Sequence, residues 1–185
     1  MYLLRDALPG RPDRGWLVSP PRPVRLLVCG TADRGDDGAA LSAVAGLLPG
    51  LPSHLLSALD VRRCEQLQIE DLLDLPDETG CVIVDAVVGV GTGEVVTLPL
   101  EAFPEVDRRA GVTPRSSHTL PMGQLIELAA ILRGRPVRGA FVGIGGRSFG
   151  YGRGLGRTVR AALPAYRAAI EAELIRFAVP TAPRI

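Results

Sequence analysis

Residues 24–38, with the sequence VRLLVCGTADRGDDG, decide the fold. The apolar run Leu26–Cys29 predicts a buried strand over 24–29. Gly30 breaks it, and a short polar loop leads through Asp36 and Asp37 into an apolar-rich helix. A strand, a loop and a helix start in this order place functional groups at the carboxyl edge of a sheet, where open α/β folds bind ligands. Unpaired N–H groups and the helix dipole favour negative charge there. We therefore expect both aspartates to be ionised and either to be able to bind a metal ion.

Strands and helices alternate along the chain that follows. Continuous apolar runs such as 81–84 are typical of strands covered on both faces, as in parallel sheets. The alternation predicts an α/β fold: a single domain, 24–185, with a twisted, mainly parallel sheet between helices, after a Pro/Arg-rich lead-in over 1–23. We expect the last helix to be interrupted or kinked at Pro164. The expected strands are 24–29, 55–63, 81–84, 94–98 and 137–144, and the expected helices are 36–48, 68–75, 122–133 and 158–178.

The composition excludes several classes of protein. A chain of 185 residues that is 46% apolar and 22% charged fits one globular domain. The net charge of +1 gives no overall electrostatic attraction to nucleic acid. No apolar run is long enough for a membrane span, and the N-terminus lacks the apolar core of a signal peptide. Cys29 and Cys81 end or begin apolar strands, so we expect buried thiols there. The three cysteines Cys29, Cys64 and Cys81 are few, odd in number and widely spaced, which favours a reducing compartment and a cytoplasmic protein.

Three polar residues stand where apolar segments stop. Asp37 follows the first strand, Asp85 ends the run VIVD, and His118 lies in RSSHTLP just before a helix. Two carboxylates and an imidazole suit a borderline divalent ion such as zinc or nickel, with open positions for substrate. Each residue also has a structural alternative, as a helix cap, a loop anchor or a helix-entry residue. We assign the cap to Asp36, which leaves Asp37 for the cleft.

Four blocks of sequence, taken together, resemble the hydrogenase maturation protease family. They are LLVCGTADRGDDG (26–38), CVIVDAVVGVGTGEV (81–95), SSHTLPMGQLIELAAILRG (116–134) and VRGAFVGIGGRSFGYGRGLGRTVRAAL (137–163), in the family's order. The resemblance implies an α/β endopeptidase that removes a C-terminal peptide from the large-subunit precursor of a nickel–iron hydrogenase once nickel is installed. It also implies that Asp37, Asp85 and His118 are the catalytic and metal-recognising residues. The nickel would be borne by the substrate, with zinc as another divalent ion that suits the same set.

The chain also departs from the family pattern. Thr31 replaces an asparagine, Asp33 replaces an apolar loop residue, residues 64–66 replace an Asp-Gly-Gly block, and Gly156 stands where a helix-capping serine is common. These changes leave the three ligands in place and bear on substrate recognition. They keep two alternatives open: a non-catalytic protein that binds a hydrogenase subunit, and a small-molecule metallohydrolase with a resident metal. Cleavage itself has two routes, through a metal-activated water or carbonyl or through a carboxylate base.

Overall fold

The computed structural model describes residues 21–105 and 120–179, so most of the lead-in and His118 lie outside the described residues. A five-stranded sheet with the order β2-β1-β3-β5-β4 forms its centre. β1 pairs in parallel with β2 and β3, β3 pairs in parallel with β5, and β4 is antiparallel to β5. The predicted mainly parallel sheet is thereby confirmed. The strands are β1 (Val24–Cys29), β2 (Leu59–Cys64), β3 (Gly80–Val87), β4 (Val95–Pro99) and β5 (Gly139–Gly145).

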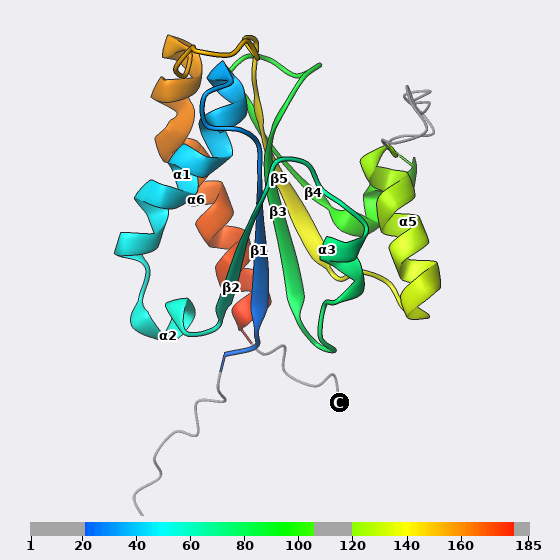
Figure 1. The fold of residues 1–185 in the computed structure, drawn as a ribbon. Coiled ribbons are helices and arrows are strands. Elements are labelled where there is room, and N and C mark those ends of the chain that lie inside the picture. The colour runs from blue at the N-terminus through cyan, green and yellow to red at the C-terminus, as the bar shows by residue number, and fades with distance from the viewer. Residues whose placement is uncertain (1–20, 106–119, 180–185) are drawn as a thin grey trace, which may run out of the picture.

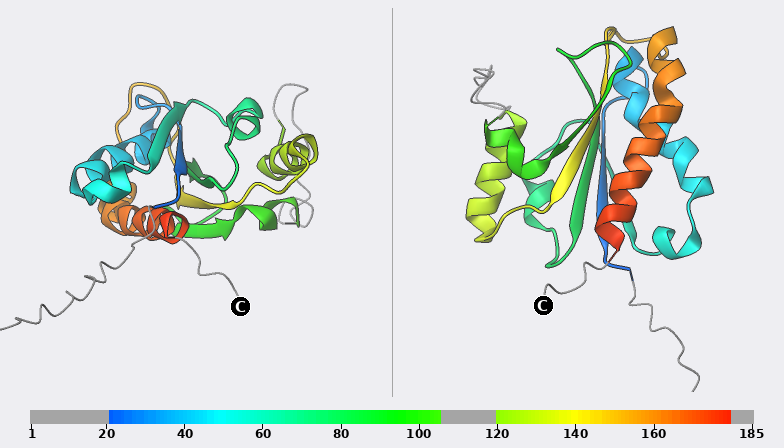
Figure 2. Two further views of the ribbon diagram at one scale, coloured as in Figure 1. Left: turned by 90° about the horizontal axis from the view of Figure 1, so that it is seen from below. Right: turned by 180° about the vertical axis from the view of Figure 1, so that it is seen from behind.

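Helices cover both faces of the sheet (Figure 1 and Figure 2). α1 (Ala39–Leu47), α2 (Ser53–Leu56) and α6 (Arg157–Ala178) lie on one face, and α3 (Glu70–Leu73) and α5 (Met122–Arg133) lie on the other. Short 3-10 turns occupy Gly35–Gly38, Leu48–Gly50 and Leu100–Ala102. Within the described part of the chain, no helix is long and apolar enough to cross a lipid bilayer.

The packing of β1 explains why its sequence is apolar at all but one position. Successive residues of a strand face opposite sides of the sheet. Leu26 and Val28 pack in the cluster that includes α1 and α6, whereas Leu27 and Cys29 pack in the cluster that includes α3 and α5. Because both clusters exclude water, every position of the strand must be apolar or paired. The exception is Arg25, which is buried on the α3 side within a set of ion pairs.

The second strand begins later than predicted. Ser53–Leu56 forms the short helix α2 after Pro52, whose fixed φ of −58° suits a helix start, and β2 begins only at Leu59. Leu55, which was expected in the strand, is instead buried in the core cluster beside α1 and α6. β2 is an edge strand with mostly exposed side chains, so its sequence lacks the apolar alternation that would have marked its start.

Two further expectations are corrected. Asp85 does not end its strand, because β3 continues to Val87 through pairing with β5. The closing helix is not interrupted at Pro164: α6 runs unbroken over 22 residues. A proline inside a helix costs about 3 kcal/mol, and the buried stripe of α6 offsets it. That stripe comprises Val159, Leu163, Tyr166, Ile170, Leu174 and Phe177.

Candidate metal-recognition edge

Three loops gather at the carboxyl edge of the parallel strands. They follow β1, β3 and β5, and they lie at the same end of the molecule (Figure 1). The opposite edge holds both ends of the described chain, where the Arg22 backbone N–H donates to the Ala178 carbonyl oxygen at 2.8 Å. The polar residues predicted from the sequence therefore have one edge at which to meet.

Asp37 is held by the loop that leads to it. It lies half-buried in the turn Gly35–Gly38, and its Oδ2 accepts a 2.8 Å hydrogen bond from the Thr31 backbone N–H. The chain folds back this tightly because Gly30 has a φ of +113°, and a Cβ there would lie 2.2 Å from the Asp37 carbonyl oxygen. No hydrogen bond from the described residues reaches the other oxygen, Oδ1. Asp37 thus has a fixed position and one carboxylate oxygen without a donor in the described part of the chain.

Asp85 is electrostatically coupled to Asp37. Burial raises the pKa of Asp85 to about 7; the 2.7 Å hydrogen bond from the Ala86 N–H to Oδ1 opposes this shift, and the negative charge of Asp37 adds to it. An acid with such a pKa readily gives up its proton to water near neutral pH when a cation binds to its oxygens. The described residues donate no hydrogen bond to Oδ2. The two predicted carboxylates therefore lie near enough at this edge for their charges to interact.

Asp36 has a structural role, but not the predicted one. Its carboxylate is 1% exposed and accepts hydrogen bonds from the backbone N–H groups of Arg147, Ser148 and Gly156 at 2.9, 3.0 and 2.7 Å. Burial acts to raise the pKa of Asp36, but these three bonds outweigh it and lower the pKa. The expected cap on its own helix is wrong, because no side chain caps the turn or α1. Asp36 instead joins the glycine-rich loop and the start of α6.

Tyr166 contacts the strand that carries Asp85, and it is not among the site residues predicted from the sequence. The residue is fully buried on α6, and its hydroxyl lies 3.0 Å from the Asp85 carbonyl oxygen and 3.1 Å from that of Val142. It therefore fastens the closing helix to the strand that carries Asp85. The sequence does contain a signal for this role: Tyr166 places a hydroxyl on the apolar stripe of the last helix. A buried tyrosine hydroxyl requires a hydrogen-bond partner.

A cavity of about 610 Å³ opens beside this edge. Thr31 lines it, and so do the three residues 64–66, so most of the positions that depart from the family pattern lie around one space. The guanidinium carbon of Arg34 lies over the ring of Tyr151, 5.1 Å from the ring centroid. The lining is completed by Gln68 and Asp71, from the segment around α3.

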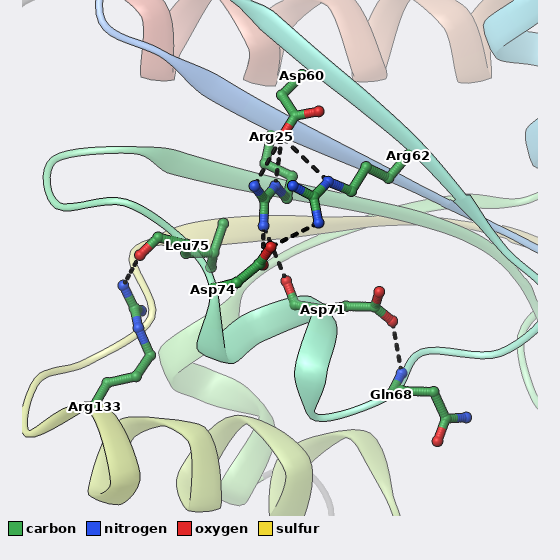
Figure 3. Close-up of polar contacts among 8 residues, drawn as sticks. All are labelled: Arg25, Asp60, Arg62, Gln68, Asp71, Asp74, Leu75 and Arg133. Carbon is green, nitrogen blue, oxygen red and sulfur yellow. Dashed lines mark hydrogen bonds and ion pairs between the residues drawn. The ribbon is translucent and has the colours of Figure 1, made fainter.

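Arg25 fixes the wall of this cavity (Figure 3). Its Nη2 lies 2.8 Å from Asp60 Oδ2 in β2, and its Nη1 contacts Asp74 directly after α3. Arg62 reaches the same two acids from the exposed side, at 3.3 Å and 2.7 Å. Burial acts to raise the pKa of Asp74, but the hydrogen bonds from both arginines outweigh it and lower the pKa. The ion pairs thus attach α3 to the edge of the sheet.

The third predicted ligand, His118, lies outside the described residues. α5 begins four residues later at Met122 and is followed by β5, which starts at the amino edge of the parallel sheet. The first turn of α5 therefore lies toward the carboxyl edge, on the face that α3 shares (Figure 1). Over residues 21–105 and 120–179, no three His, Cys, Asp or Glu side chains form a group that could hold a metal ion.

Comparison with known proteins identifies the fold. No protein-family model and no curated protein matches the chain. Among solved structures, the hydrogenase maturating endopeptidase HybD from E. coli is 20% identical, with 83% of this chain and 93% of that chain covered and a TM-score of 0.66. The [NiFe] hydrogenase maturation protease HybD from Thermococcus kodakarensis is 23% identical, with 81% and 97% covered and a TM-score of 0.56.

A third solved structure extends the likeness to another organism. The hydrogenase 2 maturation peptidase from Thaumarchaeota archaeon SCGC_AB-539-E09 is 22% identical, with 86% of this chain and 100% of that chain covered and a TM-score of 0.54. At these identities the likeness establishes the fold.

Proposed function

We propose that this protein is an endopeptidase of hydrogenase maturation, which removes a C-terminal peptide from a nickel–iron hydrogenase large subunit after nickel insertion. The observation that carries the proposal is the placement of Asp37 and Asp85 near the ends of the neighbouring parallel strands β1 and β3, at the carboxyl edge of the sheet, where their charges interact. This edge belongs to a fold shared with solved proteins named as hydrogenase maturation proteases. The four sequence blocks supply the same assignment independently.

The substrate brings the nickel in this proposal. Asp37 Oδ1 and Asp85 Oδ2 receive no hydrogen bond from the described residues, so each can turn to a cation. Carboxylate oxygens with an imidazole nitrogen form a set that suits nickel or zinc. His118 provides that nitrogen, on the strength of the SSHTLP block alone. The three side chains would grip the metal and bring the scissile bond beside it.

Asp85 can also take part in proton transfer. A carboxyl whose pKa is about 7 exists in both protonation states at neutral pH, which is the condition for an efficient general acid or base. It can take a proton from the attacking water when no metal holds it. Where the metal occupies it, the metal polarises the carbonyl or the water instead. In either route, substrates without nickel are poorly held, so cleavage reports completed metal insertion.

The cavity beside the site suits recognition of the substrate chain. Its lining combines the cation of Arg34 with the acids Glu65 and Asp71 and the exposed ring of Tyr151. A polypeptide segment of mixed charge fits this lining better than a purely apolar one. The departures at Thr31 and 64–66 would therefore change which hydrogenase subunit is accepted.

The test is the mass of a large-subunit precursor before and after incubation with this protein. We expect the nickel-loaded precursor to be shortened at its C-terminus and the nickel-free precursor to stay intact. Equal cleavage of both would remove metal recognition from the proposal. Binding without any shortening would favour the non-catalytic alternative, and a stoichiometric metal retained by the isolated protein would favour the metallohydrolase.

Matched variants test the residues. Asp37→Asn, Asp85→Asn and His118→Ala should each slow cleavage about 100-fold or more. Glu101→Gln and His54→Ala are the controls, because both residues are exposed and neither has a proposed role at the site. A full rate in His118→Ala would exclude that residue, and a loss in the controls would show that the effect is not specific to the site.

A further inference from the structure

Two of the three cysteines meet at the carboxyl edge, which their spacing in the sequence did not indicate. Cys29 and Cys64 are register partners at the last pair of the β1–β2 ladder. Their Sγ atoms lie 3.0 Å apart, joined by a thiol hydrogen bond. Cys81 is separate from them, because it pairs with Arg25 nearer the start of β1. The chain therefore holds one adjacent dithiol and one isolated thiol.

The two sulfurs differ in access and in acidity. Cys29 is 1% exposed, whereas Cys64 is half-buried and lines the 610 Å³ cavity. The hydrogen bond from Cys29 lowers the pKa of Cys64 despite burial and the acids Asp71 and Asp85, and the same contact raises the pKa of Cys29. Thiolate, the reactive form, is thus favoured on the sulfur that a small oxidant can reach.

The backbone permits a bond between them. Neighbouring strands are about 4.8 Å apart, and disulfides form between Cα atoms about 4.4–6.8 Å apart. A disulfide requires the sulfurs to approach to about 2.05 Å. Rotation of the two side chains can supply that approach from 3.0 Å without a change of strand register.

We propose that Cys29 and Cys64 are a redox modification site that closes to a reversible disulfide when a hydroperoxide reaches the cavity. The Cys64 thiolate attacks the peroxide; its S–O bond forms as the O–O bond breaks, and the leaving oxide takes a proton. Cys29 then attacks the Cys64 sulfur. The S–S bond forms, the S–O bond breaks, and hydroxide leaves with the Cys29 proton as water. Two thiols and one hydroperoxide thereby give one disulfide, one alcohol or water, and one water.

Formation of the Cys29–Cys64 disulfide would also affect the loop that holds Asp37. Gly30, next to Cys29, donates its N–H to the Cys64 carbonyl oxygen at 3.0 Å, and Thr31 beyond it holds Asp37. A covalent bond between the strand ends would fix this corner of the cavity. The proposal itself does not require the protein to be a peptidase, because it rests on the dithiol alone.

The test oxidises the full chain with hydrogen peroxide, alkylates the remaining thiols under denaturing conditions and maps them by mass. We expect the three alkylated cysteines of the reduced protein to fall to one, at Cys81, with the loss of two hydrogens and no dimer. A dithiol reductant should restore all three. Retention of all three thiols, a Cys64 sulfinic acid with Cys29 still alkylated, or a Cys64-linked dimer would each overturn the proposal.

Three variants assign the roles of the cysteines. Cys81→Ser should oxidise like the parent chain. Cys64→Ser should leave Cys29 unreactive, and Cys29→Ser should accumulate a Cys64 sulfenic acid that a sulfenic-acid-specific probe traps. An equal yield of trapped sulfenic acid with and without Cys29 would contradict its role as the resolving thiol. If a variant fails to fold, the peptide map of the unmodified chain decides the question alone.

Discussion

The Asp36 carboxylate accepts a 2.7 Å hydrogen bond from the Gly156 backbone N–H, across 120 residues of chain. With the bonds from Arg147 and Ser148, it ties the loop after β1 to the loop before α6. The next residue is Asp37, so the geometry of the candidate ligand depends on the last helix. A buried anion thus anchors the backbone at the start of α6, although no side chain caps that helix.

Asp36→Asn should lower stability by about 2 kcal/mol at pH 7, because a charged acceptor of three N–H groups is replaced by an amide whose nitrogen cannot accept. The folded-state pKa of Asp36 is lowered, so its contribution is full above the unfolded-state pKa and is lost as pH falls through the folded-state value. Urea unfolding should therefore show the difference shrinking toward pH 3. Asp33→Asn, on an exposed residue, is the control; a constant difference at all pH values would contradict this explanation.

Asp85→Asn should have the opposite effect on the metal-free protein. Because the folded-state pKa is raised to about 7, ionised Asp85 destabilises the fold above that pH, and the cost disappears below the unfolded-state pKa. The variant should gain on the order of 2 kcal/mol at pH 8, after allowance for solvent screening, and little at pH 4. Urea unfolding at the two pH values measures this. Asp37→Asn should lower the pKa of Asp85, as followed by NMR titration; no change would show that the two carboxylates are not coupled.

Tyr166→Phe should cost about 1–2 kcal/mol, because the hydroxyl bonds to two buried carbonyl oxygens are lost while the ring is kept. Tyr151→Phe removes the same group from a residue that is 70% exposed and should change stability by less than about 0.5 kcal/mol. Denaturant midpoints compare the two. Similar values for both variants would mean that the Tyr166 hydroxyl does not support β3 and β5.

Arg25→Met should cost about 1–3 kcal/mol, because the buried guanidinium loses its charge-assisted bonds to Asp60 and Asp74, while both acids keep their contacts with Arg62 (Figure 3). The pKa of Asp74 should rise toward its ordinary value. Arg62→Met removes a side chain that is 42% exposed and should cost less than about 1 kcal/mol. Unfolding curves and an NMR titration of Asp74 test both points, and equal losses would count against the burial argument.

The parts of the fold with strong local signals could be predicted from the sequence. β1 and α5 have the predicted bounds, since the first is apolar except for Arg25 and the second ends at Gly134 in the left-handed conformation with φ +67°. The meeting of Asp37 and Asp85 at one edge also followed from the alternation of strands and helices. These features depend on residues that are close in sequence or on a general rule of parallel sheets.

The remaining features depend on partners far away in the chain. Asp36 looked like a local cap because its true partners lie 111 to 120 residues later. Cys29 and Cys64 meet only because β1 pairs with β2 in a particular register. The start of β2 was predicted too early in the chain, because its mostly exposed side chains show no clear apolar alternation. Pro164 indicated a break, but the packing of α6 on the sheet was the larger effect.

The hydrogen bond from Arg22 to Ala178 also has a practical consequence for experiments. It brings the first and last described segments together at the edge farthest from Asp37 and Asp85 (Figure 1). A tether attached beyond either segment would therefore anchor the molecule with its carboxyl edge facing outward. The protein can be immobilised on a surface, or fused to a reporter, while a large folded partner still approaches the two carboxylates.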